Sequence, residues 1–138
     1  MKILKLQRRY KALLTFIAIT MGMNFIGCEK LCGEKLKSEA TSPDGRYMAA
    51  QFERNCGATT DYVAHVNLRL TSTRFKEDSS GTIKEGEVFV AEGRPQIRLA
   101  WIDSMTLVVE CIGADRVFKK EDSWQNIRIS YEISESKE

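Results

Sequence analysis

Four cysteines and one histidine are the side chains of this 138-residue chain whose chemistry is most versatile. The cysteines are Cys28, Cys32, Cys56 and Cys111, and the histidine is His65. Zinc sites need about four such ligands, commonly with two cysteines in a Cys-x-x-Cys pair, which this sequence lacks. We therefore expect no metal site and no cofactor. The remaining possibilities for these residues are disulfide formation, covalent modification and thiol catalysis.

Thiol catalysis would use Cys56 as the nucleophile, His65 as the base and Asp61 as the residue that orients the base. His65 belongs to the polar set of an alternating segment, together with Asn67 and Arg69. We expect this polar face to be solvated and Cys56 to be oxidised. Both expectations favour a non-enzymatic protein, with a small cysteine-dependent hydrolase as the alternative.

The first 27 residues have the layout of a secretory signal. Five basic residues precede an apolar run from Ala12 to Gly27, and no acidic residue occurs before Glu29. The word Phe25-Ile26-Gly27-Cys28 resembles a bacterial lipobox, in which a small residue precedes a cysteine that becomes lipid-modified. This resemblance implies a signal helix over 1–27 that is removed, acyl chains on Cys28, and sorting to the outer membrane because glutamate rather than aspartate follows. The alternative is an uncleaved membrane anchor, although spanning helices usually need about 20 apolar residues.

A lipid on Cys28 would leave three cysteines for one disulfide, so three pairings are open. Cys111 lies on the apolar face of an alternating segment and is expected to pack as a small buried hydrophobe. Cys32 and Cys56 both lie in polar, glycine-flanked segments, which suits a disulfide in an oxidising compartment. We therefore favour the pair Cys32–Cys56.

Composition places the folded part among ordinary globular domains, with 43% hydrophobic and 29% charged residues. The net charge of +2 is misleading, because five basic residues belong to the N-terminal segment and the remainder is slightly acidic. Nucleic-acid-binding domains usually carry a clustered excess of positive charge, and no such cluster occurs here. We expect no nucleic-acid partner.

Alternation of apolar and polar residues predicts an all-β fold with about six antiparallel strands in a meander that curls into a small sandwich or barrel. In the first of these strands the even positions, Met48, Ala50 and Phe52, are expected to face the core. Trp101 and Trp124 are expected to be aromatic residues of the core. The predicted strands cover residues 47–53, 62–70, 87–91, 96–101, 105–112 and 127–133.

The domain organisation follows from these elements. Residues 28–41 are polar and are expected to form a tether, residues 42–133 the β domain, and residues 134–138 a disordered tail. Residues 71–86 are rich in serine, threonine, glycine and charge, which predicts a long exposed loop.

Two resemblances involve these segments. Ser42-Pro43-Asp44-Gly45-Arg46 before a strand, with the later word Leu99–Asp103, is similar to one blade of a TolB-type β-propeller, but a single blade does not imply the whole propeller. The words SPDG and Cys56-Gly-Ala-Thr-Thr60, behind a signal and a cysteine, resemble a family of small uncharacterised bacterial envelope proteins. That resemblance implies an envelope location. It does not imply any particular activity, because the family has none assigned.

We therefore expect a membrane-anchored, extracytoplasmic binding or structural lipoprotein of unknown ligand, located in the bacterial cell envelope. Its partners would be the membrane, through the N-terminal lipid, and an envelope protein or other component. A periplasmic inhibitor or immunity-type lipoprotein is the alternative. The expected binding surface is the loop after Cys56 and the polar strand face that follows it, with Thr59, Thr60, Asp61, His65, Asn67 and Arg69.

Overall fold

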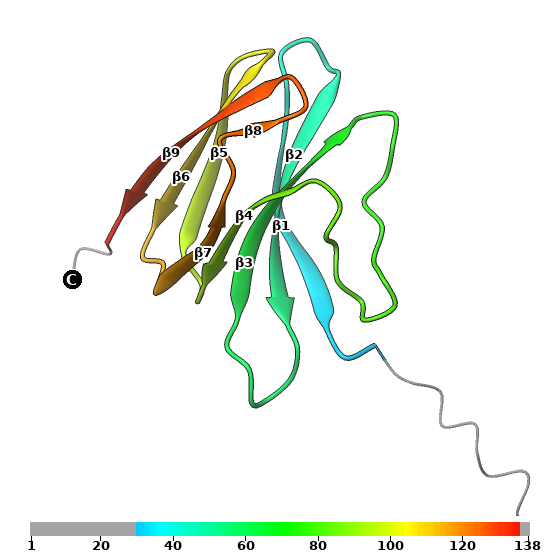
Figure 1. Ribbon diagram of the computed structural model, residues 1–138, viewed down its shortest axis with the longest axis vertical. Helices are drawn as coiled ribbons and strands as arrows, with labels where there is room; N and C mark the ends of the chain where they lie inside the picture. Colours follow the sequence, from blue (N-terminus) through cyan, green and yellow to red (C-terminus); the bar gives the residue numbers. More distant parts are fainter. Residues whose placement is uncertain (1–29, 136–138) are drawn as a thin grey trace, which may run out of the picture.

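The structure is a computed structural model that describes residues 30–135, and this part contains nine β-strands and no helix. The first sheet has the strand order β1-β2-β3-β4-β7, and the second has the order β5-β6-β9-β8. Figure 1 shows the two sheets side by side. The main hydrophobic core is formed by residues of both sheets and lies between them. The predicted all-β class is confirmed, and the form is a two-layer sandwich rather than a closed barrel. Among the described residues there is no helix long and apolar enough to cross a membrane.

Six strands match the predicted segments closely, and three were not predicted. The first sheet comprises β1 (Gly33–Thr41), β2 (Tyr47–Asn55), β3 (Val63–Leu70), β4 (Glu87–Glu92) and β7 (Arg116–Lys120). The second comprises β5 (Gln96–Asp103), β6 (Thr106–Ile112), β8 (Ser123–Trp124) and β9 (Ile127–Ser134). The additional strands are β1, β7 and β8, whose sequences are short or predominantly polar.

The core between the sheets uses the apolar face that alternation predicts in most strands. Val66 and Leu68 of β3 face Leu107 and Val109 of β6, and all four side chains are fully buried. Burying such a side chain contributes roughly 1.5–3 kcal/mol. Cys111 extends the β6 row and is buried in this core, as expected for a small hydrophobe; burial raises the pKa of its thiol.

Strand β2 departs from the prediction because both of its faces are buried. Tyr47 and Ala49 point into the core between the sheets, whereas Ala50 and Phe52 belong to a second, smaller cluster on the outer face of the first sheet. The prediction that the even positions face the main core is therefore wrong. The second cluster exists because Ile83, in the segment that links β3 to β4, covers this outer face.

The chain crosses between the sheets repeatedly, and this produces one parallel pair. After β6 the chain enters the first sheet as β7, which pairs with β4, and then returns to the second sheet. Strand β9 therefore runs beside β6 in the same direction, from Thr106↔Arg128 to Ile112↔Ser134. Every other strand pair is antiparallel, so the predicted all-antiparallel meander is correct except at this pair.

The SPDG segment is a turn, but it joins two strands. Ser42 Oγ accepts a hydrogen bond from the Tyr47 amide at 3.0 Å and donates to Asp44 at 2.6 Å, and Gly45 adopts a positive φ of 72°. The segment that precedes this turn pairs with β2 from Gly33 to Thr41. The prediction of a polar tether over 28–41 is therefore wrong for residues 33–41. This strand was not predicted because it is an edge strand whose polar side chains hide the alternation.

The C-terminal boundary of the domain also differs from the prediction. Ser134 ends β9 and pairs with Ile112, so the ordered domain extends one residue beyond the predicted boundary. The predicted signal over 1–27 and the lipid-modified Cys28 lie outside the described residues, as do residues 136–138. The two tryptophans pack against the core, as predicted, and Trp101 Nε1 donates to the Ala40 carbonyl at 3.0 Å, which ties β5 to β1.

Candidate functional site

Cys32 and Cys56 form a disulfide, which confirms the pairing that the sequence favours. Gly33 and Asn55 are paired across β1 and β2, so the disulfide joins the next residues along these two strands. The bridge spans a sequence separation of 24, for which the chain-entropy model gives roughly 3 kcal/mol of stabilisation. The β2–β3 loop is therefore held at the beginning of β1.

Three of the predicted binding residues lie together on the β2–β3 loop. Thr59, Thr60 and Asp61 are all exposed. Thr60 donates its hydroxyl to the Gly57 carbonyl at 3.1 Å and thereby stabilises the loop itself. Thr59 and Asp61 make no side-chain hydrogen bond or ion pair with any described residue, so both remain accessible to a partner.

His65 and Asn67 are placed differently from the prediction. Both side chains are 0% exposed, so the expectation of a solvated polar face is wrong for them. They lie on the outer face of the first sheet, where Phe52 stacks on the His65 ring at a centroid distance of 5.4 Å. Residues 71–86 cover this face, and Asn67 Nδ2 donates to the carbonyls of Ile83 and Glu85. Neither residue can contact a partner.

Arg69 lies at the opposite end of β3 from the β2–β3 loop, about 20 Å along the strand at 3.3 Å per residue. Its Nη1 donates to the carbonyls of Leu70, Thr71 and Thr73, and its guanidinium lies 4.9 Å from the Phe75 ring. Its Nε is buried and has no partner among the described residues. Arg69 therefore orders the start of the 71–86 segment and is not part of one surface with Asp61.

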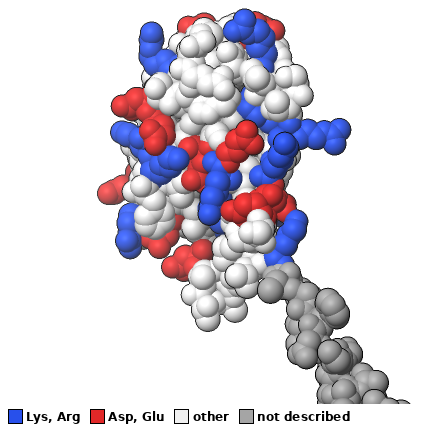
Figure 2. Space-filling model, turned by 45° about the vertical axis from the view of Figure 1, so that its right-hand side comes forward, with Lys and Arg blue, Asp and Glu red and all other residues white. Residues whose placement is uncertain are grey.

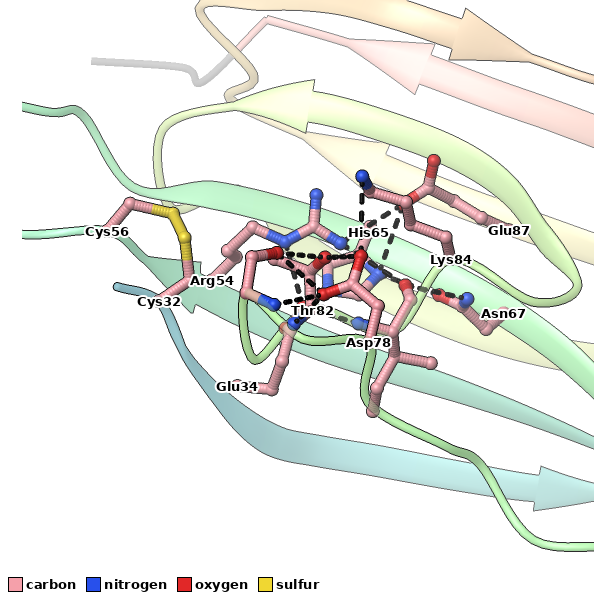
Figure 3. A network of polar contacts seen from close by, with 12 residues as sticks. Cys32, Glu34, Arg54, Cys56, His65, Asn67, Asp78, Thr82, Lys84 and Glu87 are labelled. Carbon is pink, nitrogen blue, oxygen red and sulfur yellow. Dashed lines mark hydrogen bonds and ion pairs between the residues drawn. A yellow bond between two sulfur atoms is a disulfide. The ribbon is translucent and has the colours of Figure 1, made fainter. Parts of the chain in front are cut away.

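The structure instead brings five polar side chains together beneath this segment, from four different strands (Figure 3). We call them the buried polar cluster: Glu34 of β1, Arg54 of β2, His65 and Asn67 of β3, and Glu87 of β4. The Glu34 side chain is only 1% exposed and occupies the centre. One of its carboxylate oxygens accepts from Arg54 Nε at 2.8 Å and from the Ile83 amide at 3.1 Å, and the other lies 2.6 Å from His65 Nε2.

Both ring nitrogens of His65 face oxygen atoms. Nε2 lies against Glu34, and Nδ1 lies 2.6 Å from Asn67 Oδ1. The Asn67 amide nitrogen is already directed at two carbonyls, so its oxygen must face the ring. Both contacts are hydrogen bonds only when the ring has a proton on each nitrogen. The cluster then holds two cations, His65 and Arg54, and two carboxylates.

Glu87 completes this balance. Its carboxylate accepts from Arg54 Nη2 at 3.2 Å and lies 3.7 Å from His65 Nδ1. Burial by itself would raise the pKa of Glu34, but hydrogen bonds from His65 and Arg54, the charge of His65 and the Ile83 amide together hold that pKa below its usual value of 4.5. The carboxylate is therefore kept ionised inside the protein.

Residues 71–86 are a loop that is exposed over most of its length, as the sequence predicts, and this loop is also an ordered cover. Asp78 accepts hydrogen bonds from Ser80 and Thr82, which lower the pKa of its carboxyl well below the usual range. The Ser80 carbonyl accepts from the Cys32 amide at 3.1 Å. Gly81 has a positive φ of 84°, and a Cβ there would meet the Cys32 carbonyl at 2.4 Å, so only glycine fits beside the disulfide.

The chemistry open to this arrangement is limited by burial. Cys56 is oxidised, and His65 already directs both nitrogens at protein acceptors, so the triad considered from the sequence is not assembled. Among residues 30–135, no group of three or more potential ligands is placed to bind a metal ion. The buried polar cluster instead fixes β1 and residues 71–86 to the sheet.

Sequence reasoning missed the cluster because it equated polar residues with a solvated face. One signal was present: the even positions of β2, Ala50 and Phe52, are apolar, and so are Tyr47 and Ala49 on the opposite face. A strand with apolar residues on both faces needs a cover on both. Phe75 and Ile83, the large apolar residues of the 71–86 segment, supply that cover.

Comparisons with protein-family models, with curated proteins and with solved structures found no match for this chain.

Proposed function

We propose that this protein is a non-enzymatic lipoprotein of the bacterial envelope that binds an envelope component through the β2–β3 loop. One observation carries the proposal: the Cys32–Cys56 disulfide joins this loop to the segment that directly follows Cys28. Cys32 lies four positions after the proposed lipid attachment site at Cys28, which is at most about 14 Å of extended chain. Lipid on Cys28 would therefore hold the exposed loop close to the membrane surface.

Two further features support binding rather than catalysis. Thr59 and Asp61 project from the loop without using their polar atoms in the fold, as residues reserved for a partner would. The hydrolase alternative would need a free Cys56 thiol and an accessible His65, and the structure has neither feature. A structural disulfide also suits an extracytoplasmic location, where oxidising conditions preserve it.

Anchoring is tested by mass spectrometry of the protein extracted from membranes, with peptides mapped under non-reducing conditions. We expect an N-terminal peptide that begins at Cys28 and carries acyl chains, together with a Cys32–Cys56 cross-linked peptide. The variant Cys28→Ser should lose the acyl mass and keep the disulfide. The proposal would be contradicted if Cys28 carried no acyl chain, either as the first residue of the protein or inside a longer N-terminal peptide that had not been cleaved.

Binding is tested with a photo-crosslinking amino acid at Thr59 in intact cells, because the Thr59 side chain is exposed and makes no hydrogen bond that the substitution would break. A matched control carries the same amino acid at Ser79, which is also exposed but lies in the 71–86 segment, on the outer face of the first sheet. We expect one discrete cross-linked species from position 59 and none from position 79. Equal cross-linking at both positions, or none at either, would argue against the loop as the binding surface.

A further inference from the structure

The inner face of the first sheet is not covered by the second sheet along the beginning of β1, and a hollow of about 280 Å³ lies there. Three residues across this sheet, Lys35, Glu53 and Ala64, are directly paired neighbours and so share one face. Ala64 belongs to the same face of β3 as Val66 and Leu68, which identifies the face as the inner one. The full lining is Lys35, Lys37, Gln51, Glu53, Ala64, Arg94 and Pro95.

Positive charge dominates this space, which we call the basic hollow. Lys35, Lys37 and Arg94 surround a single carboxylate, that of Glu53. Glu53 lies 3.8 Å from Lys37 Nζ and 3.4 Å from Arg94 Nε, so one anion is shared between two cations. Lys35 has no ion-pair partner among the described residues. On the face shown in Figure 2, acidic and basic side chains are interspersed.

The backbone concentrates this charge. The register between β1 and β2 shifts between Leu36 and Ser38, so Lys37 is an extra residue in the ladder. Such bulges redirect side chains and are common beside binding sites. Arg94 is held differently, since its guanidinium stacks on the Tyr62 ring at 3.4 Å. A stacked guanidinium loses little further side-chain entropy when it binds an anion.

The floor of the hollow supplies a hydrogen-bond donor. Gln51 is only 7% exposed, and its Oε1 accepts from Ser38 Oγ at 3.1 Å. Its Nε2 therefore remains a donor, and it has no partner among the described residues. This amide nitrogen is accessible from the hollow and can donate a hydrogen bond to an anion bound there.

We infer that the basic hollow binds a phosphate-type oxyanion. Such an ion offers several oxygens at once, which matches one guanidinium, two ammonium groups and one amide donor. The anion could belong to a lipid headgroup or to a soluble phosphate. The site does not depend on the lipid anchor or on the loop partner proposed above, so it can fail or succeed separately from them.

The test follows the side-chain amide signal of Gln51 by NMR in the full-length chain, held in dodecyl maltoside micelles and in phosphate-free buffer, so that no phosphate group is present at the start. Inorganic phosphate is titrated in one arm, and phosphatidylglycerol is added to the micelles in the other. A saturable shift with inorganic phosphate assigns a soluble phosphate, and a shift only with phosphatidylglycerol assigns a headgroup. No shift in either arm overturns the inference.

Charge variants show whether this hollow is responsible. Lys35→Gln combined with Lys37→Gln should weaken binding of the effective probe about tenfold or more, because two charge-assisted contacts are lost. Arg74→Gln combined with Lys76→Gln removes the same charge from the exposed 71–86 segment and should leave binding within about twofold. Equal weakening by both pairs would show nonspecific attraction and would overturn the site.

A third variant is expected to bind the probe more tightly, a result that loss of folding could not produce. Glu53→Gln removes the carboxylate that competes for Lys37 and Arg94, so we expect the probe to bind about three- to tenfold more tightly. A variant that folds poorly would not produce tighter binding. Unchanged or weaker binding by a folded Glu53→Gln protein would contradict an anion site in this hollow.

Discussion

The two faces of the first sheet are both buried, but by different means. The inner face packs apolar side chains such as Val66 and Leu68 against the second sheet. The outer face carries the buried polar cluster and is covered by residues 71–86 (Figure 3). Apolar contacts tolerate small displacements, whereas each charge in the cluster needs its own partner. The outer face is therefore more specific in its contacts and more sensitive to the loss of any one of them.

The largest expected effect comes from Glu34→Ala. This change leaves His65 and Arg54 buried without their shared carboxylate, and breaking a buried ion pair in this way costs about 3–5 kcal/mol. We expect that loss in the free energy of unfolding, measured by urea denaturation of the full-length chain in mild detergent. On the inner face, Leu68→Ala should cost about 2–5 kcal/mol through lost burial and a cavity.

The matched control is Glu39→Ala on the same strand, where the carboxylate is exposed and has no partner among the described residues. We expect a change within about 0.5 kcal/mol. A cost for Glu34→Ala no greater than that of Glu39→Ala would mean that the buried polar cluster adds nothing to stability.

Removing the disulfide should have the next largest effect. The paired variant Cys32→Ser with Cys56→Ser should lose roughly 3 kcal/mol, because the unfolded chain regains loop freedom. The loss should not be uniform: hydrogen exchange at the Ile83 amide, which donates to Glu34, should accelerate more than exchange at the Val66 amide in the centre of β3. Equal acceleration at both amides would show that the disulfide does not act through the outer face.

A smaller effect is expected where the cover itself is weakened. Phe75 is half-buried and packs edge-on against Phe52 at 5.1 Å, with Arg69 over its ring. Phe75→Ala should cost about 1–2 kcal/mol, while Phe75→Leu should recover more than half of that loss, because the cover needs apolar area more than an aromatic ring. Thermal unfolding would measure both changes. An alanine variant as stable as the parent would show that this end of the segment covers nothing.

The smallest expected effect is a difference between the two faces in how their contributions to the free energy of unfolding depend on pH. The pKa of Glu34 is held below 4.5 in the folded protein, so its contribution to stability is complete above that pH and declines as the pH falls through the lower folded-state value. The difference in unfolding free energy between the parent and Glu34→Ala should therefore shrink below pH 4.5. The corresponding difference for Leu68→Ala should not change with pH. Parallel pH curves for the parent and Glu34→Ala would contradict the depressed pKa.

Much of the fold could be predicted because apolar and polar residues alternate in most of the strands. In β3 and β6, alternation identified Val66, Leu68 and Cys111 as core residues, because successive side chains of a strand point to opposite faces of the sheet. Strand β1 could not be found in this way, because an edge strand with a polar exterior has no apolar alternation to detect. The parallel β6–β9 pair was equally hidden, since it results from a crossing between sheets.

The candidate site was predicted only in part. The loop with Thr59 and Asp61 is exposed as expected, because its composition is that of a surface turn. His65 and Asn67 were assigned to the same surface and are instead fully buried. The basic hollow was not foreseen either, since its cations come from β1 and from the β4–β5 turn, which are far apart in the sequence.

The sequence by itself therefore determined the all-β class and the turn at Ser42–Gly45, because both depend on local composition and spacing. It favoured the pairing of Cys32 with Cys56 over two other pairings, and the structure decided between them. Only the tertiary structure decided which polar side chains are buried. Burial of the His65 side chain depends on Glu34, which lies 31 positions earlier in the sequence, and on residues 71–86, which cover both side chains. Alternation records only that His65 is polar, and the carboxylates that lie against its ring come from other strands.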